Sequence, residues 1–128
     1  MALLTVAITI YMIATRIPAM AKRKIDPQLA QTPSNLHGML PPELMRISNN
    51  YNHLFEQPVL FYAVVISIAV MGQVDAFNVG CAWVYAVLRI VHSLVQVTVD
   101  NVTLRFGVFL CSWIVLGTLV VREALRIF

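Results

Sequence analysis

The segment VGCAWVYAVLRIVHSLVQVTV, residues 79–99, is apolar along almost its whole length and decides the class of fold. About 20 apolar residues in a helix cross the hydrocarbon core of a bilayer, so the segment predicts a transmembrane helix. Polar side chains recur in and just after it at spacings of three, four and four, at Arg89, His92, Gln96 and Asp100. At roughly 100° per residue these four positions share one helical face, which we call the polar stripe.

The polar stripe is the first place in the chain to look for function. Arg89 lies near the middle of the apolar segment, far from either predicted membrane surface. A charged side chain at that depth costs several kcal/mol unless it is paired or hydrated. The stripe is therefore expected to face a partner helix or a wet cavity rather than lipid.

The composition of the whole chain also indicates a membrane protein. Of its 128 residues, 59% are hydrophobic and 12% are charged, and a soluble domain of this size could not bury so much apolar surface. Four apolar runs predict spans at about residues 2–21, 43–72, 79–100 and 103–127. They use nearly every residue, so we expect a single domain, residues 1–128, folded as an all-α integral-membrane four-helix bundle.

The charged residues and cysteines argue against some classes of partner. A cluster of three cations, residues 22–24, follows the first span directly, whereas residues 72–78 contain no Lys or Arg. By the positive-inside tendency the first loop is predicted to be cytoplasmic. Because cations beside a span are usually a topology signal, the formal net charge of +3 gives no reason to expect a nucleic-acid partner. Cys81 and Cys111 have no nearby Cys or His pair, so no metal site is expected.

The second helix is expected to carry a polar half before its apolar half. Its start is marked by Pro41-Pro42-Glu43, since a helix N-terminus tolerates proline and favours an acid. The helix would then run to about Met71, with a kink near Pro58. In the polar half, side chains recur at intervals of three, four and three, at Arg46, Asn49, His53 and Glu56.

The polar ends of three helices are predicted to meet on the cytoplasmic side. Three arginines and two acids would converge there in an inner-leaflet pocket: Arg46, Arg89, Arg105, Glu56 and Asp100. Because the cations outnumber the acids, the pocket would suit a small, doubly charged anion. The alternative is that these residues only tie helices together, with Arg89 paired to Glu56 and Asp100 to Arg105.

Two motifs within these helices resemble a known family. NHLFEQPVLFY at residues 52–62 is followed by RIVHS at residues 89–93, and Arg105 lies sixteen residues after Arg89. Together they resemble the membrane-associated proteins in eicosanoid and glutathione metabolism (MAPEG). The resemblance spans about residues 43–122 and is closest to the uncharacterised bacterial branch of that family.

The resemblance implies a homotrimer of four-helix subunits that binds glutathione, as a co-substrate, between neighbouring subunits at the cytoplasmic side. Arg105 matches an arginine credited with stabilising the glutathione thiolate, and it is the predicted catalytic residue. A thiol needs an adjacent cation to be largely ionised at neutral pH, which a guanidinium supplies. The residues carried over for glutathione binding are Arg46, Asn52, Glu56, Arg89 and His92.

The match to the second-helix motif leaves two registers open. Alignment on Pro58 keeps Asn52 in register and moves Glu56 by one residue. Alignment on Glu56 restores Arg46 and places His53 at the asparagine position. The resemblance alone therefore does not select between Asn52 and His53.

The activity implied by the resemblance is that of a glutathione transferase or peroxidase acting on a lipophilic electrophile or hydroperoxide from the bilayer. The family's tyrosine one turn after the histidine-like position is Gln96 here, and a hydroxyl residue of the prostaglandin-synthase branch is Phe106. A tyrosine-assisted step is therefore not expected. The alternative function is a non-enzymatic trimeric membrane scaffold or accessory subunit. The expected location is a multi-pass position in the bacterial inner membrane, in contact with its lipids.

Overall fold

The computed structural model describes residues 1–36 and 38–127, and these residues form helices joined by short connections. No strand occurs in this part of the chain, which confirms the predicted all-α class. Two short 3₁₀ helices, η1 (Pro27–Gln31) and η2 (Pro33–Leu36), lie in the first loop. The α-helices are α1 (Ala2–Lys22), α2 (Pro42–His53), α3 (Gln57–Val70), α4 (Ala76–Val97) and α5 (Val102–Ile127).

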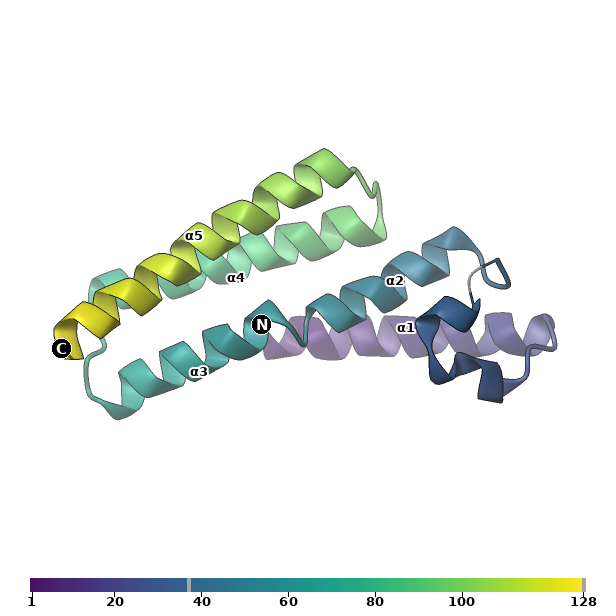
Figure 1. Cartoon of the computed structure of the whole chain (residues 1–128), viewed down its shortest axis with the longest axis horizontal. Helices are drawn as coiled ribbons and strands as arrows, with labels where there is room; N and C mark the ends of the chain where they lie inside the picture. Colours follow the sequence, from purple (N-terminus) through teal and green to yellow (C-terminus); the bar gives the residue numbers. More distant parts are fainter. Residues whose placement is uncertain (37, 128) are drawn as a thin grey trace. The chain divides into compact units, whose positions relative to one another are not determined.

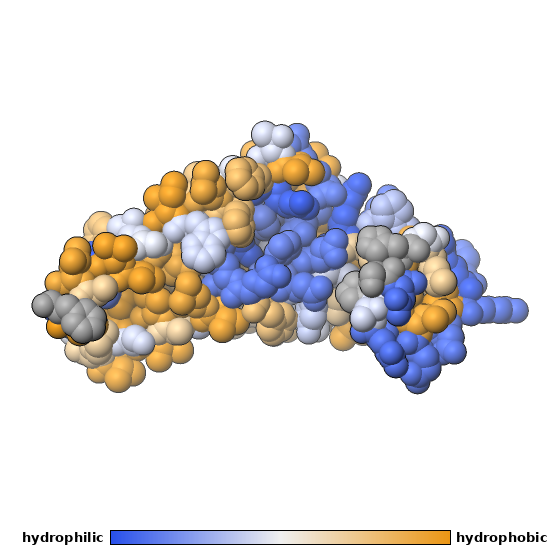
Figure 2. Space-filling model, viewed as in Figure 1, coloured by the Kyte–Doolittle hydropathy of each residue, from blue (hydrophilic) through white to orange (hydrophobic). Residues whose placement is uncertain are grey.

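Four helical segments are long and apolar enough to cross a membrane. They cover Ala2–Lys22, Pro42–Val70, Ala76–Val97 and Val102–Ile127, and the second of them comprises α2 and α3. At 1.5 Å per residue, the 26 residues of α5 extend over about 39 Å, more than the ~30 Å of a hydrocarbon core. Apolar side chains cover most of the visible face of α5 (Figure 2). The chain is therefore a multi-pass integral membrane protein.

The chain divides into two compact units, residues 2–54 and a C-terminal unit formed by residues 55–128 with Met1. In the N-terminal unit α1 packs along α2. Buried Leu36, Leu40 and Met45 form its apolar cluster beneath the first loop. Arg23 holds that loop by donating to the Met39 carbonyl at 2.7 Å.

The predicted second helix is interrupted rather than kinked. α2 begins at Pro42 with Glu43 in its first turn, as predicted, but it ends at His53, and α3 starts at Gln57. The cause is Pro58, because a proline ring collides with the carbonyl four residues earlier, here that of Leu54, and donates no hydrogen bond. The break therefore falls at residues 54–56, upstream of the proline.

In the C-terminal unit α4 and α5 form an antiparallel hairpin, and α3 packs against α5 (Figure 1). Phe61, Tyr85 and Leu116, one from each helix, are the buried centre of this unit. The rings of Phe61 and Tyr85 stack with their centroids 4.2 Å apart. The three helices of this unit are thus joined through a small aromatic and aliphatic core.

The connection between α4 and α5 corrects one sequence-based expectation. α4 ends at Val97, and Asp100 has a φ of 51°, outside the helical range. Its N–H donates back to the Val95 carbonyl at 2.8 Å, while the Asn101 side chain accepts from the Leu104 N–H at the start of α5. Asp100 therefore lies in the turn after the helix and not on the helical face that carries Arg89.

Candidate functional site

The polar stripe of α4 is buried, as its position inside a predicted span required. Arg89 is 1% exposed, Gln96 1% and His92 4%. The opposite face of α4 is apolar and open to the surroundings, with Trp83 69% exposed. Spacings of three and four residues place the stripe on the side of α4 that packs in the C-terminal unit.

Arg89 is joined to the two neighbouring helices through a neutral amide. Its Nη1 donates to Oε1 of Gln57 on α3 at 3.1 Å. The hydroxyl of Ser112 on α5 lies 3.2 Å from the same oxygen and 2.7 Å from the Phe109 carbonyl. Glu56 adds a Coulombic attraction to the Arg89 guanidinium. The amide oxygen of Gln57 on α3 is therefore shared by Arg89 of α4 and Ser112 of α5.

Arg105, in the first turn of α5, forms an ion pair with the preceding turn. Its Nη1 lies 2.7 Å from Oδ1 of Asp100, and both side chains are about a quarter exposed. The ring Nδ1 of His92 lies 3.2 Å from the Arg105 carbonyl. Since a carbonyl oxygen only accepts, Nδ1 carries the proton in this bond. His92 and Arg105 are therefore adjacent, and the anticipated pairing of Asp100 with Arg105 is present.

The predicted site residues divide between the two units. Arg89, His92 and Arg105 lie together on the α4–α5 hairpin, and Glu56 is exposed at the N-cap position of α3. Arg46 is half-buried and Asn52 is exposed, both on α2 in the N-terminal unit. The structure thus brings three of the six predicted residues together on one hairpin, with Glu56 in the same unit.

Sequence reasoning did not include Gln57 or Ser112 among the site residues. Both side chains are neutral, and the candidate site residues were chosen mainly among the charged residues nearby. The available signals were weak: Gln57 directly precedes Pro58, and Ser112 follows Arg105 by seven residues, which is about two helical turns. The contacts of Arg89 and Ser112 with the Gln57 side chain depend on how three helices pack, so they become visible only in the folded chain.

Several buried polar atoms around Arg89 have no hydrogen-bond partner within residues 1–36 and 38–127. They are Nε2 of Gln57, Oη of Tyr85, Oγ of Ser93 and Oε1 of Gln96. A buried polar group left without a partner costs about 1–3 kcal/mol, and such groups are rare in native proteins. Water, a polar ligand or a second chain would satisfy them. Within the same residues no group of three or more His, Cys, Asp or Glu side chains is placed to hold a metal ion.

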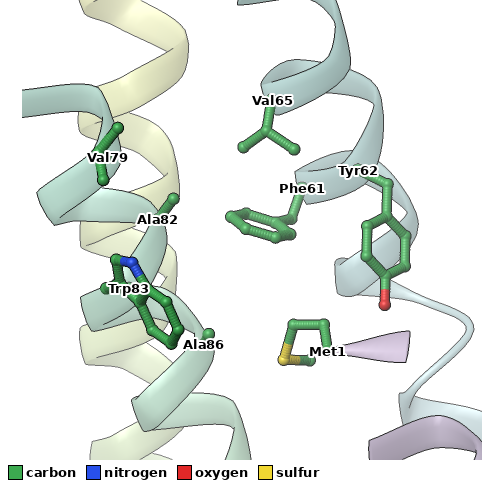
Figure 3. A pocket seen from close by; sticks show the side chains of 8 residues that line it. All are labelled: Met1, Phe61, Tyr62, Val65, Val79, Ala82, Trp83 and Ala86. Atoms are coloured by element: carbon green, nitrogen blue, oxygen red, sulfur yellow. The ribbon is translucent and has the colours of Figure 1, made fainter. Parts of the chain in front are cut away.

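An apolar cavity of about 370 Å³ lies next to this polar interior (Figure 3). Phe61 and Val65 of α3 form one wall, and Ala82 and Trp83 of α4 form the other. Phe61 also stacks on Tyr85, which lies one helical turn before Arg89. Phe61 therefore both lines the apolar cavity and stacks on the buried Tyr85.

Comparison with known proteins identifies a family. A family model described as the MAPEG family matches residues 1–125, nearly the whole chain. This match confirms the resemblance that the two sequence motifs indicated and extends it over α1, the first loop and three further residues of α5. No curated protein and no solved structure gave a significant match to the sequence.

Proposed function

The chain belongs to the MAPEG family, and on that premise we propose that it binds glutathione and activates the thiol toward a lipophilic electrophile or hydroperoxide. The family includes glutathione transferases and peroxidases. The observation that carries the proposal is the setting of Arg89. This buried guanidinium donates to Gln57, and buried polar atoms of Tyr85, Ser93 and Gln96 on the same helix have no hydrogen-bond partner within the described chain.

In this proposal Arg89 binds a carboxylate of glutathione, because a guanidinium presents paired N–H donors that match a carboxylate. Glu56 would accept from the ammonium group of the same tripeptide, and His92 would donate or accept at its backbone. Arg46 and Asn52 of α2 are the remaining proposed ligands. They would act from this chain or from a neighbouring subunit of the proposed homotrimer.

Arg105 is the proposed catalytic residue. A free thiol has a pKa near 8.5, and an adjacent cation lowers it and so favours the nucleophilic thiolate. The bond from Arg105 to Asp100 uses Nη1, which leaves Nη2 to donate to a sulfur. The thiolate would then attack the electrophile, or the peroxide oxygen, of a molecule that enters from the apolar cavity beside Phe61.

The test is turnover of a model aryl-chloride electrophile by the purified protein with glutathione. Arg105→Ala is expected to lower the rate at least tenfold while the oligomeric state is unchanged. Arg23→Ala, which removes an exposed arginine of the first loop, is the matched control. Equal turnover by wild type and Arg105→Ala would remove Arg105 from the mechanism.

A second candidate function is a non-enzymatic trimeric scaffold or accessory subunit, and the Arg105–Asp100 ion pair favours it. In that case the pair and the Arg89–Gln57–Ser112 contact serve only to join helices. Gln96, at the position of the family's tyrosine, would fit a chain without turnover. Calorimetric titration separates the two: no heat of glutathione binding at millimolar concentration supports the scaffold. For either function we propose a bacterial inner-membrane location with the first loop cytoplasmic.

A further inference from the structure

The end of the C-terminal unit opposite Arg105 carries a cluster of charges. Arg122 Nη2 lies 2.5 Å from Oδ2 of Asp75, and Arg126 Nη1 lies 3.4 Å from the same oxygen. Asp75 precedes α4 and accepts from the Asn78 N–H, so it caps that helix. Because α5 is longer than a hydrocarbon core and this cluster lies at its C-terminal end, we expect the cluster at the level of lipid headgroups.

Glu123 is the buried member of the cluster, and its two carboxylate oxygens differ. The residue is 5% exposed. Oε1 lies within 3.3 Å of donors from Asn78, Arg122 and Arg126. Oε2 is buried and has no donor within residues 1–36 and 38–127. A carboxylate accepts several hydrogen bonds, so Oε2 is a strong acceptor with unused capacity.

An apolar groove of about 290 Å³ runs past Glu123 between α3 and α5. Val64, Ile68 and Met71 of α3 line one side, and Val120 lines the other. Among the described residues, Glu123 is the one charged residue in this lining. The groove therefore combines an apolar lining with a carboxylate acceptor, a combination that suits an amphiphilic ligand.

Arg126 supplies a cation next to Glu123, although it does not itself line the groove. Its side chain is 40% exposed, and its bonds to Glu123, Asp75 and the Gln73 carbonyl all use Nη1. Within residues 1–36 and 38–127 its Nη2 and Nε make no hydrogen bond, so they can donate to further acceptors such as phosphate oxygens, which guanidinium groups bind well. The Arg126 guanidinium and the Glu123 carboxylate form an ion pair, with Nη1 lying 3.3 Å from Oε1.

We propose that this groove binds one phospholipid with a primary-ammonium headgroup, of the phosphatidylethanolamine type. An acyl chain fills the apolar groove, the ammonium donates to Oε2 of Glu123, and the phosphate binds Arg126. Charge complementarity selects this lipid. A choline headgroup has no N–H to donate, and an anionic glycerol headgroup brings no cation to Glu123.

The test on the wild-type protein compares lipids that differ only in the methylation of the headgroup. Protein in nanodiscs holds equal fractions of phosphatidylethanolamine, its mono- and dimethylated derivatives and phosphatidylcholine, and native mass spectrometry counts the lipids that stay bound. Retention is expected to stay similar through the dimethylated lipid, which keeps one N–H, and to fall about tenfold for phosphatidylcholine, since only the trimethylated headgroup loses the charged hydrogen bond. Equal retention of all four lipids would overturn the proposal.

Substitutions then identify the residues. Glu123→Gln is expected to reduce the preference for phosphatidylethanolamine to less than twofold. Arg126→Gln, which removes a phosphate contact that all four lipids share, is expected to lower the retention of all of them by a similar factor. Glu43→Gln and Arg23→Gln, both at exposed positions of the N-terminal unit, are the matched controls and should keep the full preference. If Glu123→Gln does not fold, the methylation series on wild type still decides.

A second copy of the chain is the competing occupant of the groove. Cross-links between Ala124→Cys copies, together with an absence of retained lipid, would show that another subunit fills the groove and would overturn the proposal. The lipid site does not depend on glutathione. If glutathione binds but no headgroup preference is found, the lipid proposal alone fails. If the headgroup preference is found but glutathione does not bind, the proposed function alone fails.

Discussion

Gln57 of α3 and Arg89 of α4 are joined by a 3.1 Å hydrogen bond between a neutral amide and a guanidinium that is 99% buried. The amide oxygen of Gln57 orients the guanidinium between α3 and α4. This contact shows how a buried cation is fixed at one position inside a span.

The Gln57–Arg89 bond is expected to contribute measurably to stability. Gln57→Leu leaves Arg89 and Ser112 without their shared acceptor and should lower the free energy of unfolding by about 2–3 kcal/mol. Thr118→Ala is the matched control, since this exposed hydroxyl bonds only to the Ile114 carbonyl of its own helix. It should change stability by less than about 0.5 kcal/mol. Thermal unfolding in detergent measures both, and similar effects of the two variants would contradict the role of Gln57.

Asp100 is expected to restrain Arg105. Asp100→Asn removes the carboxylate 2.7 Å from the Arg105 guanidinium and leaves the cation free to act on a thiol. The pKa of the thiol of bound glutathione should fall, and the conjugation rate at neutral pH should rise by about three- to tenfold. The ultraviolet absorbance of the thiolate, followed against pH, reports the change. An unchanged titration would mean that Arg105 does not face the sulfur.

Asp75 is expected to make the stability of the C-terminal unit decrease at acidic pH. The Arg122 side chain, which donates to Asp75, and the Asn78 N–H lower the pKa of Asp75 from 3.8 to about 2. A carboxyl group whose pKa is lower in the folded than in the unfolded state stabilises the folded protein at pH values above its unfolded-state pKa. That stabilisation is lost as the pH falls toward the pKa of the group in the folded state. Wild type should therefore lose more stability than Asp75→Asn between about pH 4 and pH 2. Chemical unfolding at several pH values tests this, and parallel curves would refute it.

Gly72 closes α3 in a conformation that other residues adopt with strain. Its φ is 67°, the Gly72 N–H donates to the Ala69 carbonyl, and the Gln73 N–H donates to that of Ile68, as in a Schellman motif. Gly72→Ala should lower the free energy of unfolding by about 1 kcal/mol. Gly80→Ala, within α4 and with open space around the added methyl group, should raise it by up to about 1 kcal/mol. Shifts of the same sign in thermal unfolding would contradict this assignment.

Sequence reasoning was most successful where a residue's place depends on local periodicity. Hydrophobic run lengths predicted the four spans, and the spacing of Arg89, His92 and Gln96 predicted one buried face. It was less successful at ends of helices. Asp100 fits the helical spacing but lies in the turn, because α4 ends at Val97. The kink expected at Pro58 is a break, because the steric effect of proline acts four residues upstream.

Contacts between helices were the least predictable part of the candidate site. The pairing of Asp100 with Arg105 was anticipated as one of two alternatives because opposite charges five residues apart are visible in the sequence. The role of Gln57 was not, since nothing in a lone glutamine indicates which of many donors it will meet. A charged residue inside a span is expected from sequence to have a partner, whereas the partner of a neutral amide depends on how the helices pack.

The position of Phe61 has a consequence for any molecule that reaches this interior. Its ring lines the apolar cavity and also stacks on Tyr85. A hydrophobic compound that enters this cavity from the membrane therefore meets a ring that packs on a buried polar side chain, and it does so without crossing an aqueous phase. The concentration that matters to this protein is then set by partitioning into the bilayer, so poorly water-soluble compounds would be presented to it most effectively.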